Sequence, residues 1–333
     1  MHVGINYAWR NYAWDFGEPA HSDGGSAWGA RAAWAPTIEA ELDAFRLIGL
    51  DVVRWFVLAD GTTYGVGDQK PVVDPQRFGQ WRFHEIPTLS EAWLEDFTKL
   101  LQCCESQKIR LLPSVLDFHF CFPGVSVPSS PHVKCGRADA IIDPSKRRRL
   151  FENVFDPIIA ICQRFPETVY ALEIMNEPEW CTDDGTWQSD KKVVPIGSML
   201  DFFAEGAARI NRAGLRSTVG FAKHRSMKDW DSPGLGLSLH QWHYYCDPES
   251  VPDNDMSSHG PCIVGEFPSG RWRAWKELGD AQDTRSRLSL LRQKGYDGAL
   301  LWSANKEEEK IAEPVVEWSE RVRDEVAAFI AGR

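Results

Sequence analysis

Short apolar runs alternate with amphipathic segments along the whole chain. Eight of these runs predict strands. Within each run the residues are mostly apolar rather than alternating with polar ones, which is typical of parallel strands that are covered on both faces. The predicted strands are Val3–Ala8, Asp51–Leu58, Arg110–Phe118, Val169–Met175, Ser217–Ala222, Leu237–Tyr245, Pro261–Phe267 and Asp297–Trp302.

The amphipathic segments between these runs predict helices. Thr88 and Glu91 have the spacing of a capping box at the start of one helix, and Asp143-Pro144 supplies an N-cap and a first-turn proline for another. The segments 223–236 and 246–260 are rich in Pro, Asp and Ser and are too short for full helices. The predicted helices are Thr37–Ile48, Leu89–Gln107, Asp143 to about Phe165, Pro195–Ala213, Asp280–Lys294 and Glu313–Ala331.

Eight strands with repeated helical crossovers predict a single (β/α)8 barrel of the α/β class over residues 1–333. We expect a long aromatic-rich loop after the first strand and reduced helices after the fifth and sixth strands. A doubly wound parallel sheet is the alternative. It is weakened because no predicted strand is followed by a glycine-rich phosphate loop.

The composition restricts the partners of this chain. With 43% hydrophobic residues the chain can bury a large core, and its net charge of −11 argues against nucleic acid and anionic membranes. No apolar run reaches the roughly 18–20 residues of a membrane span. A strand-like segment begins at His2 and leaves no room for a signal peptide, so we expect a cytoplasmic protein, or a secreted one if a signal peptide has been removed. The oligomeric state stays open.

The eight cysteines lack C-x-x-C or any other metal-binding spacing. We interpret most of them as buried thiols in a reducing compartment. Cys121 and Cys135, in one long predicted loop, are the pair that would form a disulfide if this interpretation is wrong.

Polar and aromatic residues gather at the carboxyl ends of the predicted strands, where (β/α)8 barrels hold their catalytic groups. Each residue alone has an ordinary structural explanation; His240, for example, fits a buried structural histidine better than a functional one. Together they converge on one mouth of the barrel. The set comprises Arg54, Asp60, Asp117, His119, Glu173, Asn176, Glu177, His240, His243, Tyr245, Glu266, Trp302 and Asn305.

Two of these residues, Glu177 and Glu266, end the fourth and seventh strands, which lie on roughly opposite sides of an eight-stranded barrel. Cleavage of a glycosidic bond requires two facing carboxyl groups, one to protonate the leaving oxygen and one to attack the anomeric carbon. The attacking carboxylate must stay ionised, which Arg54 and Tyr245 can favour, while the acid must keep its proton. This chemistry requires no metal or other cofactor. A metal cluster is the less favoured interpretation of Asp117, His119, Glu177 and His243.

The strand ends also carry six short motifs, which are, in chain order, GLDVVRWF, VLDFH, LEIMNEP, HYY, VGEF and LLWS. In this order they resemble the motifs of the clan of retaining (β/α)8 glycoside hydrolases, most closely the cellulase-like glycoside hydrolase family 5. The resemblance covers most of the chain, from residue 3 to residue 305.

This resemblance implies a role for each matching residue. Glu177 would be the general acid/base and Glu266 the nucleophile. Asn176 would hydrogen-bond the sugar 2-hydroxyl, and Arg54 and Tyr245 would orient Glu266. The other implied substrate-binding residues are Asp117, His119, His243 and Trp302, the last as the platform beneath the cleaved sugar.

Three features depart from the pattern of that family, and one of them is the nearly missing helix after the sixth strand. Pro268 stands after the nucleophile strand where a glycine is common, and the loop AWRNYAWDFGEPAHSDGGSAWGARAAW after the first strand is longer than expected. A long loop over the mouth favours a pocket, and with it exo action or short oligosaccharide substrates. The loop tryptophans, which either stack on sugars or cap the barrel, are Trp9, Trp14, Trp28 and Trp34.

The sequence thus predicts a retaining β-glycosidase that acts on gluco- or manno-configured oligosaccharides or glycosides. A non-hydrolytic carbohydrate-binding barrel and a transglycosylase that uses the same two glutamates are the alternatives. Sugar configuration and endo or exo action stay open.

Overall fold

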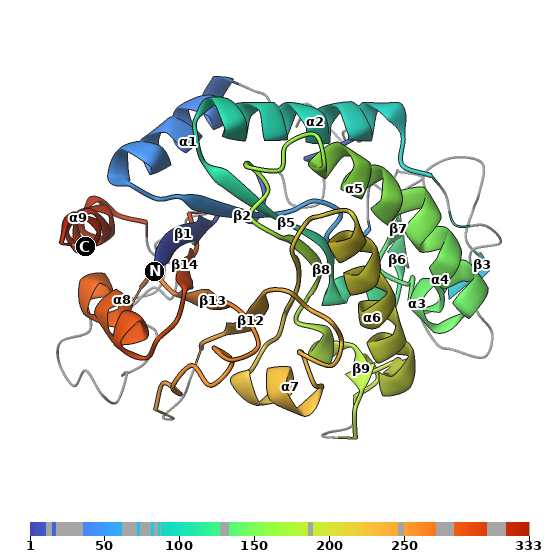
Figure 1. Ribbon diagram of the computed structural model, residues 1–333. Helices are drawn as coiled ribbons and strands as arrows, with labels where there is room; N and C mark the ends of the chain where they lie inside the picture. Colours follow the sequence, from blue (N-terminus) through green and yellow to red (C-terminus); the bar gives the residue numbers. More distant parts are fainter. Residues whose placement is uncertain are drawn as a thin grey trace.

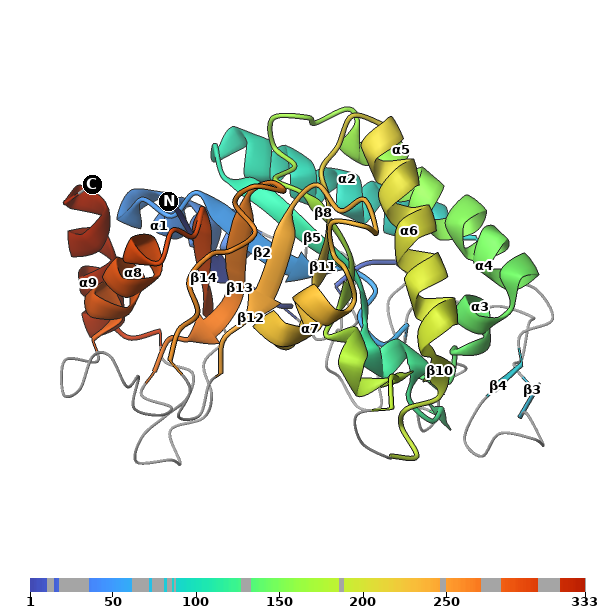
Figure 2. The ribbon, with the colours of Figure 1, turned by 60° about the horizontal axis from the view of Figure 1, so that its bottom comes forward.

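Eight parallel strands form one sheet that curves into a barrel, with helices around its outside (Figures 1 and 2). The strands are β1 (His2–Asn6), β2 (Val52–Phe56), β5 (Arg110–Asp117), β8 (Leu172–Asn176), β11 (Ser217–Gly220), β12 (His240–His243), β13 (Cys262–Pro268) and β14 (Gly298–Trp302). Their order across the sheet is β11-β8-β5-β2-β1-β14-β13-β12, so chain neighbours are sheet neighbours. All eight predicted strands are confirmed, and the doubly wound alternative is wrong.

The computed structural model describes residues 1–10, 15–17, 36–61, 72–73, 81–82, 86, 88–126, 133–185, 189–245, 250–270, 283–304 and 318–332. Trp14, Trp28, Trp34 and Asn305, which the sequence singled out, lie outside these ranges.

The two ends of the sheet, β11 and β12, meet through a parallel bridge beside their carboxyl ends. Phe221, just after β11, donates its N–H to the carbonyl of Gln241 (3.3 Å) and accepts a bond from the N–H of His243 (2.8 Å). Backbone groups of an edge strand need partners. This bridge supplies them and closes the barrel at the rim that carries the candidate residues.

The helices follow the predicted crossovers. They are α1 (Pro36–Ile48), α2 (Glu91–Ser106), α3 (Asp139–Ile142), α4 (Pro144–Leu150), α5 (Asp156–Cys162), α6 (Ile196–Arg212), α7 (His224–Asp229), α8 (Thr284–Gln293) and α9 (Glu320–Ala331). The reduced helices are confirmed, since the crossover after β11 contains the short α7 and the described residues between β12 and β13 form no helix.

The helix predicted from Asp143 to about Phe165 is continuous but contains a π turn, η4 (Phe151–Phe155), between α4 and α5. Pro157 has no N–H and therefore cannot donate to the carbonyl of Asn153. The N–H of Leu89 donates to that carbonyl instead (3.3 Å). The wider turn thus lies where the proline interrupts the helical hydrogen bonds.

The two predicted helix caps had different outcomes. Asp143 caps α4 as expected, because its Oδ1 accepts bonds from the N–H groups of Ser145 (2.8 Å) and Lys146 (3.2 Å). The capping box of Thr88 with Glu91 is wrong. Ser90 is the N-cap of α2 instead, and its Oγ accepts the N–H of Trp93 (3.2 Å). The helix begins at Glu91, so Thr88 lies too far upstream to reach the first free N–H groups.

Several short elements carry too few residues to show a periodic pattern and were not predicted. They are the paired strands β3 (Val72–Val73) with β4 (Trp81–Arg82), β6 (Val125–Ser126) with β7 (Val133–Lys134), and β9 (Thr182–Asp183) with β10 (Val194–Pro195), and the single turns η3 (Phe118–Cys121) and η5 (Pro178–Trp180). The turn η3 follows β5 directly, η5 follows β8 after Glu177, and both shape the rim of the barrel.

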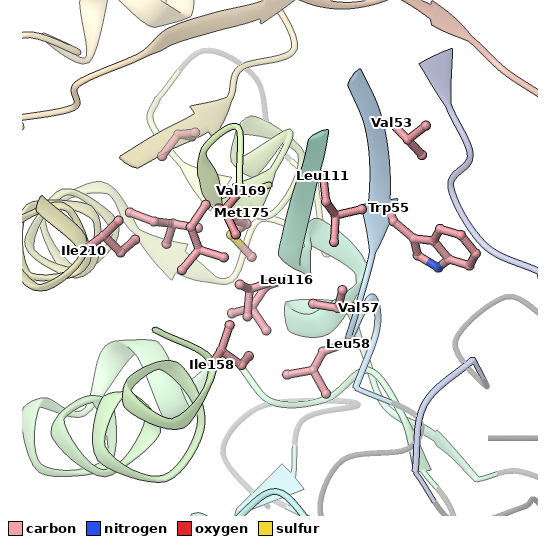
Figure 3. Close-up of a cluster of buried hydrophobic side chains, with 14 of the residues drawn as sticks. Val53, Trp55, Val57, Leu58, Leu111, Leu116, Ile158, Val169, Met175 and Ile210 are labelled. Carbon is pink, nitrogen blue, oxygen red and sulfur yellow. The ribbon is translucent and has the colours of Figure 1, made fainter. Parts of the chain in front are cut away.

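The main core lies between the strands and the surrounding helices. Figure 3 shows part of it, which extends from Trp55 on β2 at one side, past Leu111 on β5, to Ile158 on α5 and Ile210 on α6 at the other side. No helix in the described part of the chain is long and apolar enough to cross a membrane.

A second, smaller cluster joins Val52, Leu112, Ile263 and Leu300, which come from four different strands and are fully buried. Such a layer of strand side chains is expected inside a barrel. Residues two apart on a strand share one face. The next inward positions on β2 and β5 are therefore Arg54 and Ser114, so a polar layer lies directly above an apolar one.

The α2 cap gives a test of local structure. Ser90→Ala should lower the free energy of unfolding by about 1 kcal/mol, because the N–H of Trp93 loses its partner. Thr88→Ala is the matched control and should change stability by less than about 0.5 kcal/mol. Denaturant unfolding of both variants measures the difference. A larger loss of stability in Thr88→Ala than in Ser90→Ala would show that Thr88 caps the helix.

Candidate active site

Arg54 is the centre of the polar layer. Its side chain is fully buried and all five of its N–H donors are used. Nε and Nη2 bind the two carboxylate oxygens of Glu173 (2.7 and 2.6 Å), and Nη2 also reaches Asn176 Oδ1 (2.7 Å). Nη1 donates to Asn6 Oδ1 (2.9 Å) and Glu266 Oε1 (2.5 Å). Burial alone would lower the pKa of Arg54, but the charges of Glu173 and Glu266 outweigh it and raise this pKa.

Glu173 on β8 is the main counter-ion of Arg54 and is itself fully buried. Its Oε1 also accepts the hydroxyl of Ser114 (2.8 Å), and its Oε2 accepts the amide of Gln241 (2.8 Å). A buried carboxylate is stable when it is paired and fully hydrogen-bonded. Glu173 meets both conditions, which indicates a structural function within the barrel.

Glu266 on β13 accepts hydrogen bonds from two donors, Arg54 and Tyr245, and lies near His243. Oε1 accepts from Arg54 and lies 3.5 Å from His243 Nδ1, and Oε2 accepts the hydroxyl of Tyr245 (2.6 Å). Burial raises the pKa of Glu266, while His243, Arg54 and the Tyr245 hydroxyl act in the opposite direction. These donors favour the ionised carboxylate.

Glu177 follows β8 and faces Glu266 across the barrel mouth. Its Oε1 lies 2.8 Å from His243 Nδ1, and its Oε2 accepts the indole N–H of Trp180 (2.8 Å). The backbone of Glu177 is left-handed, with φ of 43°, a conformation that costs roughly 1–2 kcal/mol in a residue with a side chain. Burial raises the pKa of Glu177 to about 7, although the bond from Trp180 lowers it.

The shared neighbour His243 is a neutral imidazole. It is fully enclosed, and burial lowers its pKa to about 4 despite the nearby charge of Glu266. It therefore contacts Glu177 and lies near Glu266 without adding a positive charge at neutral pH.

Asn176, Asp117 and His119 continue this network toward the rim. The Nδ2 of Asn176 donates to Asp117 Oδ2 (2.8 Å), and Asp117 Oδ1 accepts the backbone N–H of His119 (2.9 Å) and contacts its ring Nδ1. Burial would lower the pKa of His119, but its bond to Asp117 and the charge of that carboxylate raise it. Asp117 thus orients both the side-chain amide of Asn176 and the partly exposed imidazole of His119.

An aromatic group lies beside the polar layer. The guanidinium of Arg54 stands 4.7 Å from the ring centre of Phe56, and Phe56 packs edge-on against Trp302, with ring centres 6.3 Å apart. Trp9, from the loop after β1, contacts both rings (5.7 and 6.4 Å). Trp9 and Trp302 are partly exposed, so they form an accessible aromatic wall.

The structure brings together all nine residues that the sequence proposed for the site, with Trp302 linked through Phe56. His240 is not among them, because its Nδ1 bonds to Ser232 (2.8 Å) in a buried position, as its structural interpretation predicted. Sequence reasoning missed four residues of the network and gave Glu173 no role. The missed residues are Asn6, Ser114, Trp180 and Gln241; of these, Asn6, Ser114 and Gln241 lie on predicted strands and showed a signal as polar residues in apolar runs.

The spacing of Glu177, His243 and Glu266 would also suit a metal ion, because one ligand atom of each lies within 4.8 Å of the others. This set differs from the less favoured cluster named above, since Glu266 replaces Asp117 and His119. The guanidinium of Arg54 already lies 2.5 Å from Glu266 Oε1. A fixed cation at that distance opposes a second one, so the residues fit a carboxyl pair better than a metal centre.

None of the seven cysteines in the described part of the chain is in a disulfide, Cys121 and Cys135 included. The thiol of Cys121 forms a hydrogen bond with Cys181, which follows η5, rather than a disulfide with Cys135. Burial raises the pKa of Cys121 well above its usual value, so this thiol stays protonated and unreactive.

The fold can now be compared with known proteins. No protein-family model matches the sequence, and a search of curated protein sequences also finds no match. Solved structures do match. The fold is that of a (β/α)8 barrel, the fold that the resemblance implied.

Three of the similar structures cover nearly the whole chain. The beta-mannanase from the blue mussel Mytilus edulis has a TM-score of 0.67 at 19% identity and aligns over 99% of this chain and 91% of its own. The endo-1,4-beta-mannanase from Eisenia fetida has a TM-score of 0.69 at 18% identity, over 100% and 91%. The exo-beta-1,4-mannosidase from Opitutaceae bacterium strain TAV5 has a TM-score of 0.61 at 16% identity, over 100% of this chain but 59% of its own.

The central arginine predicts a large stability effect. Arg54→Met should lower the free energy of unfolding by about 3–5 kcal/mol at neutral pH, because Glu173 and Glu266 stay buried without their counter-ion. The deficit should shrink as the pH falls, since protonation removes both uncompensated charges. Denaturant unfolding across a pH series measures this.

Arg110→Met is the matched control. Arg110 lies at the start of the adjacent strand β5 and pairs with Asp51 in a partly exposed position (3.2 Å). Its loss should change stability by less than about 1 kcal/mol. Equal losses in the two variants would show that the buried network does not depend on its cation.

Proposed function

We propose that the chain is a retaining glycoside hydrolase that cleaves β-glycosidic bonds. The observation that carries the proposal is the pair of carboxyl groups at the mouth, where an oxygen of Glu177 lies within 4.8 Å of an oxygen of Glu266. Retaining enzymes hold their two carboxyl groups about 5–5.5 Å apart, and inverting ones about 6.5–9.5 Å apart. The short separation therefore supports a covalent route.

In the first step, Glu266 attacks the anomeric carbon while Glu177 gives its proton to the departing glycosidic oxygen. The carbon–oxygen bond to the leaving sugar breaks and a bond to Glu266 forms. In the second step, Glu177 takes a proton from water, the water oxygen bonds to the anomeric carbon, and Glu266 is released as a carboxylate. Two inversions at the same carbon give net retention.

The surroundings of the two glutamates support this division of roles. Glu266 accepts hydrogen bonds from a guanidinium and a phenol hydroxyl, which stabilise its anion. Glu177 instead accepts a hydrogen bond from an indole N–H and contacts a neutral imidazole. Two carboxylates this close are unfavourable, so one of them keeps a proton. Burial raises the pKa of Glu177 to about 7, which suits a general acid near neutral pH.

Substrate contacts follow from donors that the network leaves available. The amide nitrogen of Asn176 uses one hydrogen on Asp117, and its second hydrogen suits the sugar 2-hydroxyl. Trp302 and Trp9 offer indole surface for the apolar faces of sugars. Because the two indoles contact each other, they support a binding site that is closed where they lie, as in a pocket for short oligosaccharides.

We propose β-manno-configured oligosaccharides as the first substrates to test, because the three similar structures described above are mannan- or mannoside-active enzymes. Product analysis on β-mannan, β-glucan, xylan and short aryl glycosides would separate endo from exo action and manno- from gluco-specificity. The ratio of hydrolysis to transfer at high acceptor concentration separates a hydrolase from a transglycosylase. Absence of turnover on the whole panel would favour a binding protein.

The nucleophile role predicts a rescue experiment. Glu266→Ala should lower kcat by several orders of magnitude, because it removes the covalent route. Added azide should restore part of the activity and give a glycosyl azide of inverted configuration. Chromatography of the products and steady-state kinetics measure both effects.

Glu105→Ala, on the exposed face of α2, is the control and should keep wild-type activity. If Glu266→Ala retains more than about a tenth of wild-type kcat, the loss is under about 1.4 kcal/mol and another residue is the nucleophile.

The acid role of Glu177 predicts a dependence on the leaving group. Glu177→Ala should lower kcat/KM for oligosaccharides by about 10²–10⁴-fold relative to its effect on aryl glycosides with acidic phenols, which leave without a proton. In the wild type, kcat/KM should fall as the pH rises through about 7, because Glu177 must be protonated. This basic limb should flatten in the variant. A purely structural Glu177 would instead give equal losses on both substrates and an unchanged basic limb.

A further inference from the structure

Gln241 is a fully buried polar residue on β12, two positions before His243. Its Nε2 donates to Glu173 Oε2 (2.8 Å) and also lies 3.5 Å from His243 Nε2. Glu173 decides which end of the amide faces it, because a carboxylate bound to Arg54 accepts hydrogen bonds and donates none. With the amide turned over, the Gln241 oxygen would lie against that carboxylate. The NH2 group of Gln241 therefore points at both neighbours.

Two glycines fix Gln241 in this position. A Cβ at Gly220 would lie 2.9 Å from Glu173 Oε1 and 3.0 Å from both Gln241 Nε2 and His243 Nε2. A Cβ at Gly265 would lie 2.6 Å from Gln241 Nε2. The shortest contact at each position, 2.9 Å at Gly220 and 2.6 Å at Gly265, is closer than packing allows, and the 3.0 Å contacts are tight. Glycine on β11 and on β13 therefore leaves the room in which the amide reaches Glu173 and His243 together.

The hydrogen count on this amide then determines where His243 carries its proton. One hydrogen of Nε2 is used on Glu173, and the second points to His243 Nε2. That ring nitrogen must present its lone pair to accept the bond, so the proton of the neutral ring lies on Nδ1. From there it donates to Glu177 Oε1 at 2.8 Å.

We propose that Gln241 is a positioning residue that holds His243 in the Nδ1–H tautomer, so that the imidazole donates to Glu177 instead of accepting from it. The catalytic meaning of this contact rests on the proposed function. In the opposite tautomer, Nδ1 would accept the proton of Glu177 and hold it away from the glycosidic oxygen. In the tautomer proposed, His243 and Trp180 donate to the two oxygens of Glu177 and stabilise the anion left when its proton departs.

The side chain of His243 is fully buried, so no exposed group among the described residues competes for this role. The charged and titratable side chains that act on it within the described structure are Glu177, Glu266, Glu173, Asp117 and Arg54. None of these lies as close to His243 Nε2 as Gln241 in the described contacts, which leaves the amide as the group that distinguishes the two ring nitrogens.

The tautomer is measured directly by nitrogen NMR on protein that contains isotope-labelled histidine, with His243→Asn used to identify the signal. We expect a protonated Nδ1 and a bare Nε2 in the wild type at neutral pH. Gln241→Met, which keeps the length of the side chain but has no donor, should give a mixture of tautomers. A protonated Nε2 in the wild type overturns the proposal, and this wild-type measurement decides it even if the variant does not fold. An unchanged tautomer in a folded Gln241→Met also overturns it.

Kinetics supply the second measurement. Gln241→Met should lower kcat/KM for oligosaccharides by about tenfold, the effect of one misdirected hydrogen bond, and should affect aryl glycosides with acidic phenols much less. Thr218→Val is the matched control, because Thr218 on β11 is buried and its hydroxyl makes no hydrogen bond within the described residues. Equal loss of Gln241→Met activity on both substrate types overturns the positioning role. If the wild type cleaves no β-glycoside, the proposed function fails, while the NMR result still decides the tautomer.

Discussion

The buried guanidinium of Arg54 is the charge on which the polar interior of this barrel depends. It joins β2 to β1, β8 and β13 through Asn6, Glu173, Asn176 and Glu266, and it uses every donor that it has. An unpaired charge in this position would be strongly unfavourable, and so would Glu173 or Glu266 without it. The strands can therefore meet at this level only in a register that brings these groups together.

The layered filling of the barrel explains how such a network is accommodated. Below it, Val52, Leu112, Ile263 and Leu300 form an apolar floor that excludes water. Low polarity around a charge strengthens each pairing and raises the penalty for each missing one. As a result, the same burial that requires Arg54 to be paired also raises the pKa of Glu177 to about 7. Stability of the interior and acidity at the rim have one physical origin.

The comparison with solved structures shows how little sequence this architecture requires. A chain with 19% identity to the blue mussel beta-mannanase reaches a TM-score of 0.67 with it. Parallel strands need continuous apolar runs, and helices need one apolar face, but many residue choices satisfy both. The polar strand ends are more restricted, because each must match partners on other strands.

The sequence by itself determined the eight strands, the barrel class and nine of the residues that meet at its mouth. Continuous apolar runs mark buried parallel strands, and chain direction alone sends their carboxyl ends to one rim. Glu177, Glu266, Arg54 and Tyr245 were therefore identifiable before any contact was known. Local signals were less reliable, since Ser90 caps α2 and the predicted Thr88 does not.

The tertiary structure decided which of these residues bind one another. Asn6, Ser114 and Gln241 lie far along the chain from the residues that they bind, and they meet their partners because register and closure place strand faces together. Trp180 is different, since it follows Glu177 by three residues and reaches it through the turn η5. Cys121 likewise meets Cys181 rather than forming a disulfide with Cys135. The spacing of residue types along a chain indicates which segments are strands or helices and in which direction they run. A hydrogen bond, by contrast, needs atoms placed to within a few tenths of an ångström. Those distances exist only once the barrel has closed.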